Sequence, residues 1–478
     1  MPIGTLRKDA LGVPQIVFFV VAAAAPLTAV VGVTPASFTL GNGPGVPLTF
    51  LLVGVLYLLF SAGFTAMSGF VGSCGGFYSY IVAGLGPIVG VAGAMIALAT
   101  YATIEVGLCG MFGFFLDSMA TSYGGPSLDW WIYPMVLLAF VHACGRRSIE
   151  FSGAVLACCM IAEVTILLLM GIAILVMVTA GPAKPILFTP FGPATLMPGL
   201  GMSLVFVVTA FVGFEATAIF GEEARDRGRT IPRATYIAVL LIALFYAFTT
   251  WTIALYYGPD RIQEQAAQHT ATLYLAAVKA LLGQVASHVM QGLLVASLFA
   301  CALSFHNTLN RYLFAAGREG LLWRGLGRTH PRHHSPLYAG VVQTAVMVGA
   351  VGLFALAGAD PYAVVFAWMG TFSSLGILML QLLVSIAVIA FFWRKTYGMS
   401  LWRRLIAPGL SAVGLAACLV LMSANLELVS GSSSWIVKSF PLMLVAVGVA
   451  GAGLSLWVRA RKPEVYAHLG RTFHPELG

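Results

Sequence analysis

The chain has 478 residues, of which 59% are apolar and only 9% are charged, and its formal net charge is +8. Soluble domains carry about 25% charged residues, so composition excludes a water-soluble fold. Apolar runs fill the chain from Gln15 to Trp457, which also excludes a string of soluble domains. The basic residues stand in short segments between apolar runs, not on one soluble face, and this excludes nucleic-acid binding.

The first apolar run, from about Pro14 to Phe38, follows the basic pair Arg7-Lys8. It is long for a signal-peptide core, so we interpret it as the first membrane span. A helix needs about 20 apolar residues to cross the hydrocarbon. The sequence therefore predicts an all-α integral membrane protein with about twelve spans, of which the fourth is the shortest. The spans are predicted near 15–38, 46–67, 86–116, 128–143, 153–180, 197–220, 234–257, 284–316, 337–358, 362–393, 405–424 and 435–458.

The distribution of Lys and Arg predicts the orientation in the membrane. With twelve spans both termini lie on one side, and that side holds all but four of the 25 basic residues. Basic residues are in excess in cytoplasmic loops, so we expect a multi-pass protein of the cell membrane with both termini in the cytoplasm. The four exceptions are Lys184, Arg261, Lys279 and Lys438.

Two sets of five spans are predicted to form an inverted repeat. Five crossings are an odd number, so the second set is upside down relative to the first, as in many secondary transporters. The predicted units are a first five-helix repeat at 14–180, an inverted repeat at 195–394, helices eleven and twelve at 405–459, and a cytoplasmic tail at 460–478.

The first span of each set contains a weak point in mid-membrane. Pro26 in span one cannot donate a backbone hydrogen bond and collides with the preceding turn, whereas span six contains Gly213 followed by Glu215. Each feature alone also fits a plain kink. Their matching positions predict that helices one and six are broken, face each other and enclose a binding site.

Two stretches around these weak points match a known pattern. Gly75-Gly76-Phe77-Tyr78-Ser79-Tyr80, with Gly84-Leu85-Gly86 after it, follows the second span. Phe211-Val212-Gly213-Phe214-Glu215 lies in the sixth span. Both stretches resemble segments of the amino acid–polyamine–organocation permeases, a superfamily with the leucine-transporter fold.

Two cytoplasmic links extend the resemblance over about residues 14–394. Glu222-Glu223-Ala224-Arg225 with Ile231-Pro232-Arg233-Ala234 resembles the family's link after helix six. The stretch from Arg311 through Arg318-Glu319-Gly320-Leu321-Leu322, with Ser335-Pro336, resembles its link after helix eight. The resemblance implies a transporter whose substrate binds between broken helices one and six.

The sequence departs from the family pattern at two places. Leu27-Thr28-Ala29 stands where the family usually has a G-[ST]-G triplet, and Thr65-Ala66 stands in the region of a family Glu late in the second span. The backbone of the pocket is therefore expected to differ in shape. This difference leaves open whether the substrate is an amino acid or an amine.

The two breaks are expected to bind different groups of the substrate. The half-helix after the first break begins with N–H groups and a positive dipole end, which suit a carboxylate, and Thr28 either adds a hydroxyl or bonds back to its own helix. By resemblance, the carbonyls before the second break suit an ammonium group. The predicted substrate residues are Pro26, Leu27, Thr28, Ala29, Ala210, Phe211, Val212 and Gly213.

Three acidic residues lie inside spans, where a carboxylate is costly and indicates function. Glu163, near the middle of span five, stands in a region where several proton-coupled relatives have a Lys, and Glu215 matches a family Glu linked to proton sensing. Glu105 has no family counterpart. Each acid is a candidate for proton coupling, with Glu163 first, and each could instead form a structural hydrogen bond to a neighbouring helix.

Aromatic residues in the spans are candidate gates or plain packing residues. The candidates for gating are Tyr101, Phe206 and Trp368. The histidines at 330, 333 and 334 lie in a basic loop without cysteine or acid, so we expect contact with lipid headgroups and no metal. No nucleophilic triad, phosphate loop or helical HExxH motif is present, so we expect no cofactor and no enzyme activity.

The sequence thus favours a secondary transporter for an amino acid that works by alternating access, either coupled to protons or as an exchanger. The alternatives are an amine or polyamine transporter and, on the same scaffold, a passive channel or sensor. A channel needs a continuous polar pore, and these spans are too apolar to suggest one. The expected partners are the small-molecule substrate, protons and membrane lipid.

Overall fold

The computed structural model describes residues 11–71, 76–146, 149–180, 199–330 and 335–470. Within these ranges the chain is almost entirely helical, and its β contacts are two isolated bridges, Leu11 with Ala224 and Thr329 with Pro336. Outside the described residues lie Arg7, Lys8, Gly75, Lys184 and the loop at 331–334 with two of its histidines. The prediction of an all-α fold is confirmed.

Eleven helical stretches in the described residues are long and apolar enough to cross a membrane, and α7 (Ile132–Gly145) is a shorter apolar helix at the predicted fourth span. At 1.5 Å per residue α7 covers roughly 21 Å of a hydrocarbon layer about 30 Å thick. The long stretches are α1 with α2 (Val13–Ala24, Pro26–Gly32), η1 with α4 (Gly43–Gly45, Val46–Ser68), α6 (Pro87–Ser122), α8 (Ile149–Ala180), α10 with η2 (Leu200–Thr209, Phe214–Glu222), α11 (Arg227–Tyr257), α13 (Leu273–Arg318), α14 (Leu337–Leu356), η4 with α15 (Pro361–Phe366, Ala367–Arg394), η5 with α16 (Trp402–Ile406, Ala407–Ala424) and α19 (Phe440–Arg461).

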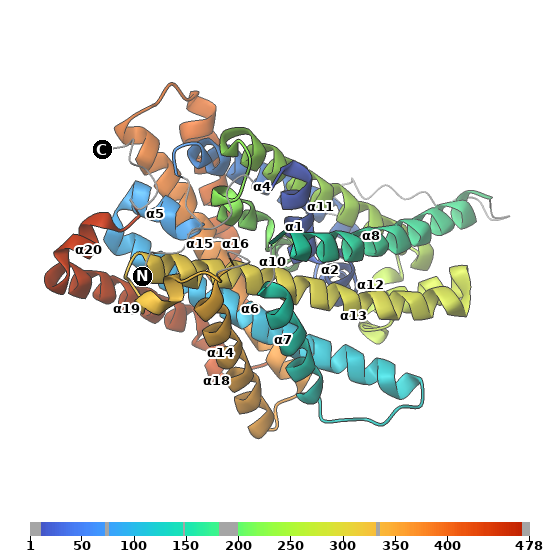
Figure 1. Cartoon of the computed structure of the whole chain (residues 1–478). Helices are drawn as coiled ribbons and strands as arrows, with labels where there is room; N and C mark the ends of the chain where they lie inside the picture. The colour runs from blue at the N-terminus through green and yellow to red at the C-terminus, as the bar shows by residue number, and fades with distance from the viewer. Residues whose placement is uncertain (1–10, 72–75, 147–148, 181–198, 331–334, 471–478) are drawn as a thin grey trace.

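Short helices connect these spans at both ends of the bundle. In Figure 1, α5 and α20 lie at one end and α12 at the other. The short helices are α3 (Thr34–Leu40), α5 (Phe77–Leu85), α12 (Ile262–Gln268), η3 (Arg324–Gly327), α17 (Leu426–Ser430), α18 (Trp435–Lys438) and α20 (Pro463–His468).

The 46-residue helix α13 is two helices joined at a glycine. Gly283 has φ 88° and ψ 173°, a backbone conformation that only glycine adopts readily. The part of α13 after Gly283 coincides with the predicted eighth span, and the part before it is an additional helix. The hydropathy pattern located the span but not the preceding helix, which carries polar residues such as Lys279.

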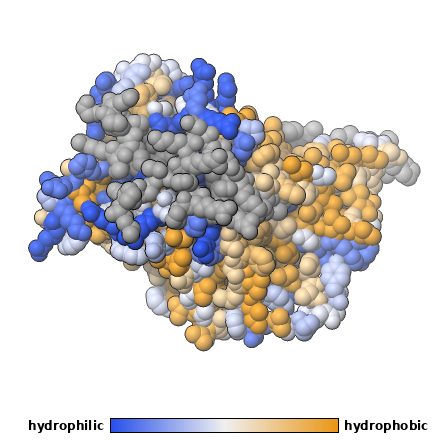
Figure 2. All heavy atoms as spheres, viewed as in Figure 1, coloured by the Kyte–Doolittle hydropathy of each residue, from blue (hydrophilic) through white to orange (hydrophobic). Residues whose placement is uncertain are grey.

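The outer surface has the distribution expected of a membrane protein. On the face shown in Figure 2, hydrophobic side chains cover the middle of the bundle, and strongly hydrophilic ones gather toward the end where α5 and α20 lie. Large apolar residues on several helices are exposed, including Leu356 at 88% and Leu244 at 60%. Lipid is the environment that covers such a surface.

The family-like motifs meet at the α5 end of the bundle. Arg311 on α13 donates to both carboxylate oxygens of Glu223, at 2.8 and 3.1 Å, and both side chains are buried. The backbone of Leu11 pairs with that of Glu223 and Arg225 at 2.9 and 2.8 Å. A buried bidentate pair is strong only when both partners remain, so it holds the start of α1, the link after η2 and α13 together.

A second contact at this end joins two other motifs. The Tyr78 hydroxyl on α5 donates to the Glu319 carboxylate at the end of α13. Burial and the neighbouring carboxylate raise the pKa of Tyr78 well above its ordinary value, so Tyr78 remains a donor. The amide of Phe77 donates to Tyr312 at 3.0 Å, and Gly76, with φ 47°, leaves space for that tyrosine. These contacts close this end of the bundle.

Gly213 provides a test of how the two broken spans pack. A Cβ added at Gly213 would lie 2.7 Å from Cβ of Ala23, and its φ of 111° disfavours any side chain. We expect Gly213→Ala to destabilise the protein by about 1–3 kcal/mol, measured by thermal unfolding in detergent. Gly349→Ala on α14 is the control, because nothing lies within 4 Å of its Cβ position. An equal loss of stability in the control would contradict the predicted clash.

Candidate functional site

The first span is broken at Ala25, one residue before Pro26. Ala25 has φ 45° and ψ 76°, the left-handed region, and α2 starts at Pro26. Proline disfavours the α conformation in the residue before it, so α1 cannot continue through this point. A non-glycine residue in this region is strained and needs support from its surroundings.

The start of α2 is supported by a buried carboxylate. Oε2 of Glu163 on α8 accepts a hydrogen bond from the amide of Leu27 at 3.2 Å and from the hydroxyl of Ser297 on α13 at 2.7 Å. The Ser297 hydroxyl also accepts from the amide and the hydroxyl of Thr28, at 3.4 and 3.0 Å. Pro26 has no N–H, and the amide of Ala29 bonds to the carbonyl of Ala25. The first amides of α2 are therefore all paired within the protein.

The end of α1 is paired in the same way. The carbonyl of Ala23 accepts from the thiol of Cys301 on α13 at 3.2 Å, and that of Ala24 accepts from the hydroxyl of Tyr246 on α11 at 3.0 Å. Backbone groups inside a membrane have no water to satisfy them, so a break is stable only with such partners. The first break thus uses side chains from three neighbouring helices.

The second break is paired differently. α10 ends at Thr209, and the chain turns through Ala210–Gly213 before η2. The Glu215 carboxylate accepts from the amide of Gly213 and from the hydroxyl of Tyr101 on α6, both at 3.0 Å. Among the described residues, the carbonyls of Ala210 and Val212 accept no hydrogen bond. This break therefore presents free acceptors.

A cavity of about 440 Å³ lies between the two breaks. Thr28 and Ala29 of α2 and Ala210 and Val212 of the second break line it, together with parts of α3, α6, α13, η4 and α15. Its lining extends to Thr270 and Gly431, which are exposed and lie beyond the α12 and α17 ends of the spans. The cavity thus reaches the surface at the end opposite the closed α5 end, and its volume is that of a small-molecule site.

The predicted substrate residues divide into two groups. Thr28, Ala29, Ala210 and Val212 line the cavity. Pro26, Leu27, Phe211 and Gly213 lie outside the lining and form the breaks themselves, with the Phe211 ring packed 5.1 Å from that of Tyr57. The sequence thus identified the two breaks but did not separate residues that face the cavity from those that support it.

Of the three predicted gates, only Phe206 lines the cavity. Tyr101 is fully buried and holds Glu215, and Trp368 lies outside the lining although its neighbour Ala367 is part of it. The aromatic residues that do line the cavity with Phe206 are Phe305, Tyr362 and Phe366. The sequence analysis missed these three because aromatics are common throughout the spans.

Hydroxyl groups on α15 were also missed. Thr371, Ser373 and Ser374 line the cavity and stand together in an otherwise apolar span, a signal that the sequence did contain. Each donates its proton to a carbonyl of its own helix, at 2.7–2.9 Å. Such hydroxyls still have lone pairs to offer to a ligand.

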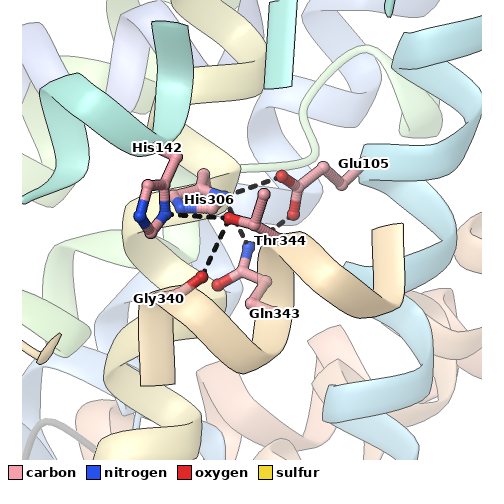
Figure 3. Close-up of polar contacts among 6 residues, drawn as sticks. All are labelled: Glu105, His142, His306, Gly340, Gln343 and Thr344. Atoms are coloured by element: carbon pink, nitrogen blue, oxygen red, sulfur yellow. Dashed lines mark hydrogen bonds and ion pairs between the residues drawn. The ribbon is translucent and has the colours of Figure 1, made fainter. Parts of the chain in front are cut away.

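Glu105, the third intramembrane acid, lies away from the cavity in a separate polar cluster (Figure 3). Its carboxylate contacts Nδ1 of His306 on α13 at 2.8 Å and accepts from Nε2 of Gln343 on α14 at 2.5 Å. His142 on α7 lies beside this group and contacts the hydroxyl of Thr344 at 3.0 Å. The three predicted acids therefore occupy three sites: the first break, the second break and this cluster.

These features define a multi-pass membrane protein with a small-molecule cavity between two broken helices. The chain belongs to the amino acid permease family, whose model matches residues 15–465. The family resemblance inferred from the motifs is thereby confirmed.

Individual relatives cover part of the chain. It is 24% identical to the low-affinity putrescine importer PlaP of Escherichia coli over 314 residues, or 64% of this chain and 65% of that protein. It is 25% identical to the branched-chain amino acid permease BcaP of Lactococcus lactis over 311 residues, or 61% and 64%. An uncharacterized transporter of Mycobacterium tuberculosis, Rv1999c, is 30% identical over 248 residues, or 52% and 48%. The chain thus spans about two thirds or less of each relative, and these relatives bear the names of transporters, in agreement with the predicted lack of enzyme activity.

The contact between Ser297 and Glu163 can be tested by a double-mutant cycle. Removing a hydrogen-bonded hydroxyl costs about 0.5–1.5 kcal/mol, and residues in one network are not additive. We expect Ser297→Ala and Glu163→Gln to show a coupling energy above about 0.5 kcal/mol in unfolding measurements. Ser304→Ala is the matched control, because Ser304 on the same helix bonds to the carbonyl of Phe19 and does not touch Glu163. If the effects of Ser297→Ala and of Ser304→Ala on unfolding both simply add to that of Glu163→Gln, the network is contradicted.

Proposed function

We propose that this protein is a secondary transporter that moves a small protonated amine across the membrane by alternating access. The observation that carries the proposal is the cavity between two broken helices, open at one end of the bundle and closed at the other. Such a site in mid-membrane is how many secondary transporters expose a substrate to one side at a time. Family membership supports the transport of amino acids or amines, and the polar groups of the cavity favour the amine.

The hydrogen-bonding groups that line the cavity are mainly acceptors. The free carbonyls of Ala210 and Val212 are acceptors by nature. The serine and threonine hydroxyls that line the cavity give their protons to other protein groups and retain lone pairs. These hydroxyls are Thr28, Thr209, Thr270, Thr371, Ser373, Ser374 and Ser430. An ammonium group has three donors and no acceptor, so it complements this lining.

The place where a substrate carboxylate would bind is already occupied. By resemblance to the family, a carboxylate is expected on the amides at the start of α2, but Glu163 and Ser297 hold those of Leu27 and Thr28. A second carboxylate there would stand beside Glu163, and like charges in a poorly solvated site repel strongly. An amine without a carboxylate avoids this repulsion and gains attraction to Glu163 and Glu215 behind the cavity wall.

An amino acid is the second candidate, supported by the likeness to a branched-chain amino acid permease. Its carboxylate would have to displace the Glu163 side chain from Leu27, or bind elsewhere in the cavity. Competition between matched compounds distinguishes the two candidates.

We further propose that protons are coupled to transport at Glu163. The residue is 1% exposed, and an ionised carboxylate in such a place is expensive without a compensating positive charge. An amine in the cavity supplies that charge, and a proton supplies it when the amine leaves. Amine and proton would then exclude each other, which links the two fluxes because coupling is reciprocal.

The membrane orientation follows the same proposal. The excess of Lys and Arg in alternate loops supports a position of the closed α5 and α20 end, with both termini, on the cytoplasmic side of the plasma membrane. The cavity of this conformation would then face outward. The two five-helix repeats, at 14–180 and 195–394, would move relative to each other, with 405–459 packed outside them and 460–478 as a cytoplasmic tail.

The first prediction on function concerns the carboxylate. In proteoliposomes, 3-methylbutylamine and putrescine should inhibit uptake of a radiolabelled amine at least about tenfold more strongly than leucine and ornithine, which carry the same side chains with a carboxylate. Leucinamide keeps the ammonium group but has an uncharged amide in place of the carboxylate, so it should inhibit as strongly as 3-methylbutylamine. Stronger inhibition by the two amino acids would favour the second candidate, and no uptake of either class would contradict transport.

The second prediction concerns Glu163→Gln. Gln can still accept the hydrogen bond from Leu27 but carries no charge and does not titrate. We expect amine affinity to fall roughly tenfold, about 1.4 kcal/mol, and uptake to lose its response to an imposed pH gradient. Ser304→Ala, which leaves the Glu163 contacts intact, should respond to the gradient as the parent does. A variant that responds like the parent would make Glu163 structural and Glu215 the next candidate.

A further inference from the structure

Glu105, His306 and Gln343 form a buried polar cluster that the transport site does not use. They come from α6, α13 and α14, and their side chains converge between these helices (Figure 3). Glu105 is 0%, His306 1% and Gln343 1% exposed. Burying three polar side chains in the membrane interior costs free energy, so their convergence needs an explanation beyond packing.

The contacts within the cluster require a proton between Glu105 and His306. Oε1 of Glu105 and Nδ1 of His306 are 2.8 Å apart, and without a proton both atoms are acceptors that repel. Nε2 of Gln343 lies 2.5 Å from the other carboxylate oxygen and 2.9 Å from Nδ1, and it supplies donors only. Whichever of the pair carries the proton, the contact holds one.

The pair can also hold a second proton. An ionised Glu105 beside a neutral His306 has a net charge of −1, and among the described residues His306 is the sole ion-pair partner of Glu105. One more proton makes the pair neutral overall, which removes the penalty of an uncompensated charge in the membrane interior.

The surrounding helices supply few other charges. His142 lies on α7 and Arg146 follows directly after its end, and on α6 the buried Tyr101 and Cys109 each lie one turn from Glu105. On α13, Arg311 is already paired with Glu223, and Glu163 contacts the helix at Ser297, more than two turns away from His306. The helices α15 and α19, which also pack on α6, carry no titratable residue before Arg394 and Arg459. Glu105 and His306 thus dominate the protonation of the cluster.

The outer edge of His306 faces α7. A Cβ at Gly145 would lie 3.6 Å from Nε2 of His306, and this buried nitrogen has no hydrogen-bond partner among the described residues. The ring of the half-buried His142 packs edge-to-face against that of His306, with centroids 6.4 Å apart. His142 therefore lies between the cluster and the surface, on the side from which a proton would reach Nε2.

We propose that Glu105 and His306 form a proton-binding site, distinct from the substrate cavity, that is loaded from the α7 side past His142. The residues immediately before this pair, Ile104 and Phe305, line the cavity. The pair therefore connects α6 and α13 directly behind the cavity wall. A bound proton holds these two walls together, and its release leaves a buried charge that favours their separation.

The test uses the full chain purified in detergent and does not depend on transport. Thermal unfolding is measured from pH 5 to 8 for the parent, Glu105→Gln, His306→Gln and the control His288→Gln, which removes a half-buried histidine from the same helix. Because the second proton makes the buried pair neutral, the parent should gain stability relative to both cluster variants as pH falls. The gap in melting temperature at pH 5 should exceed that at pH 8 by at least about 2 °C.

The melting temperature of His288→Gln should change with pH as that of the parent does. The test needs only one cluster variant that folds, and Glu105→Gln replaces a side chain by one of nearly the same shape. If the melting temperatures of both cluster variants change with pH as that of the parent does, the proposal is overturned. Failure of the uptake experiments would leave this result unaffected, because unfolding reports proton binding alone.

Discussion

Hydrogen bonds from Glu163 and Ser297 to the first amides of α2 hold the break in the first span and position the helices around it. A helix that begins inside a membrane exposes N–H groups that water cannot satisfy. Glu163 comes from α8 and Ser297 from α13, so the pairing of two amides also fixes the position of two helices around α2. The negative carboxylate at this end agrees in sign with the dipole of α2, although that helix has only seven residues. Together with Cys301 and Tyr246 on the last carbonyls of α1, these partners hold the strained conformation of Ala25.

The two breaks have opposite chemistry because their support differs. At the first break both the amides of α2 and the last carbonyls of α1 are used by protein side chains. At the second break Glu215 and Tyr101 stabilise Gly213, while two carbonyls stay free beside the cavity. A ligand therefore meets acceptors from the second break and a closed surface from the first. In a cavity with few polar groups, this imbalance determines which end of a small polar molecule is bound.

Local properties of the sequence predicted the spans and the breaks. Backbone groups in lipid must be satisfied within a helix, so hydropathy alone located the eleven long apolar stretches and the shorter α7. The steric effect of Pro26 located the first break to within one residue. The partners of the break could not be predicted, because Glu163 and Leu27 are 136 residues apart and meet only through helix packing. The same holds for His306 and Gln343, which no sequence pattern connects to Glu105. The family resemblance predicted a substrate site between the two breaks, but not that Glu163 of this protein would pair with an amide at the start of α2, where the resemblance implies a substrate carboxylate.

One helix, α13, carries polar contacts to most parts of the site. Ser297 joins it to α2 and α8, Cys301 and Ser304 join it to the carbonyls of α1, and Arg311 joins it to the link after η2. Hydrogen bonds in a nonpolar interior are lost at a high cost, so α1, α2 and α13 should move as one body when the cavity changes its opening. The helix α13 contacts α6 through the rings of Phe305 and Tyr312, which lie beside Tyr101, and through the Glu105–His306 pair. Two links of α13 therefore involve a buried carboxylate, Ser297 with Glu163 and His306 with Glu105. Under the proposals of proton binding at both places, protonation changes the strength of both links and so acts on the cavity walls that they hold.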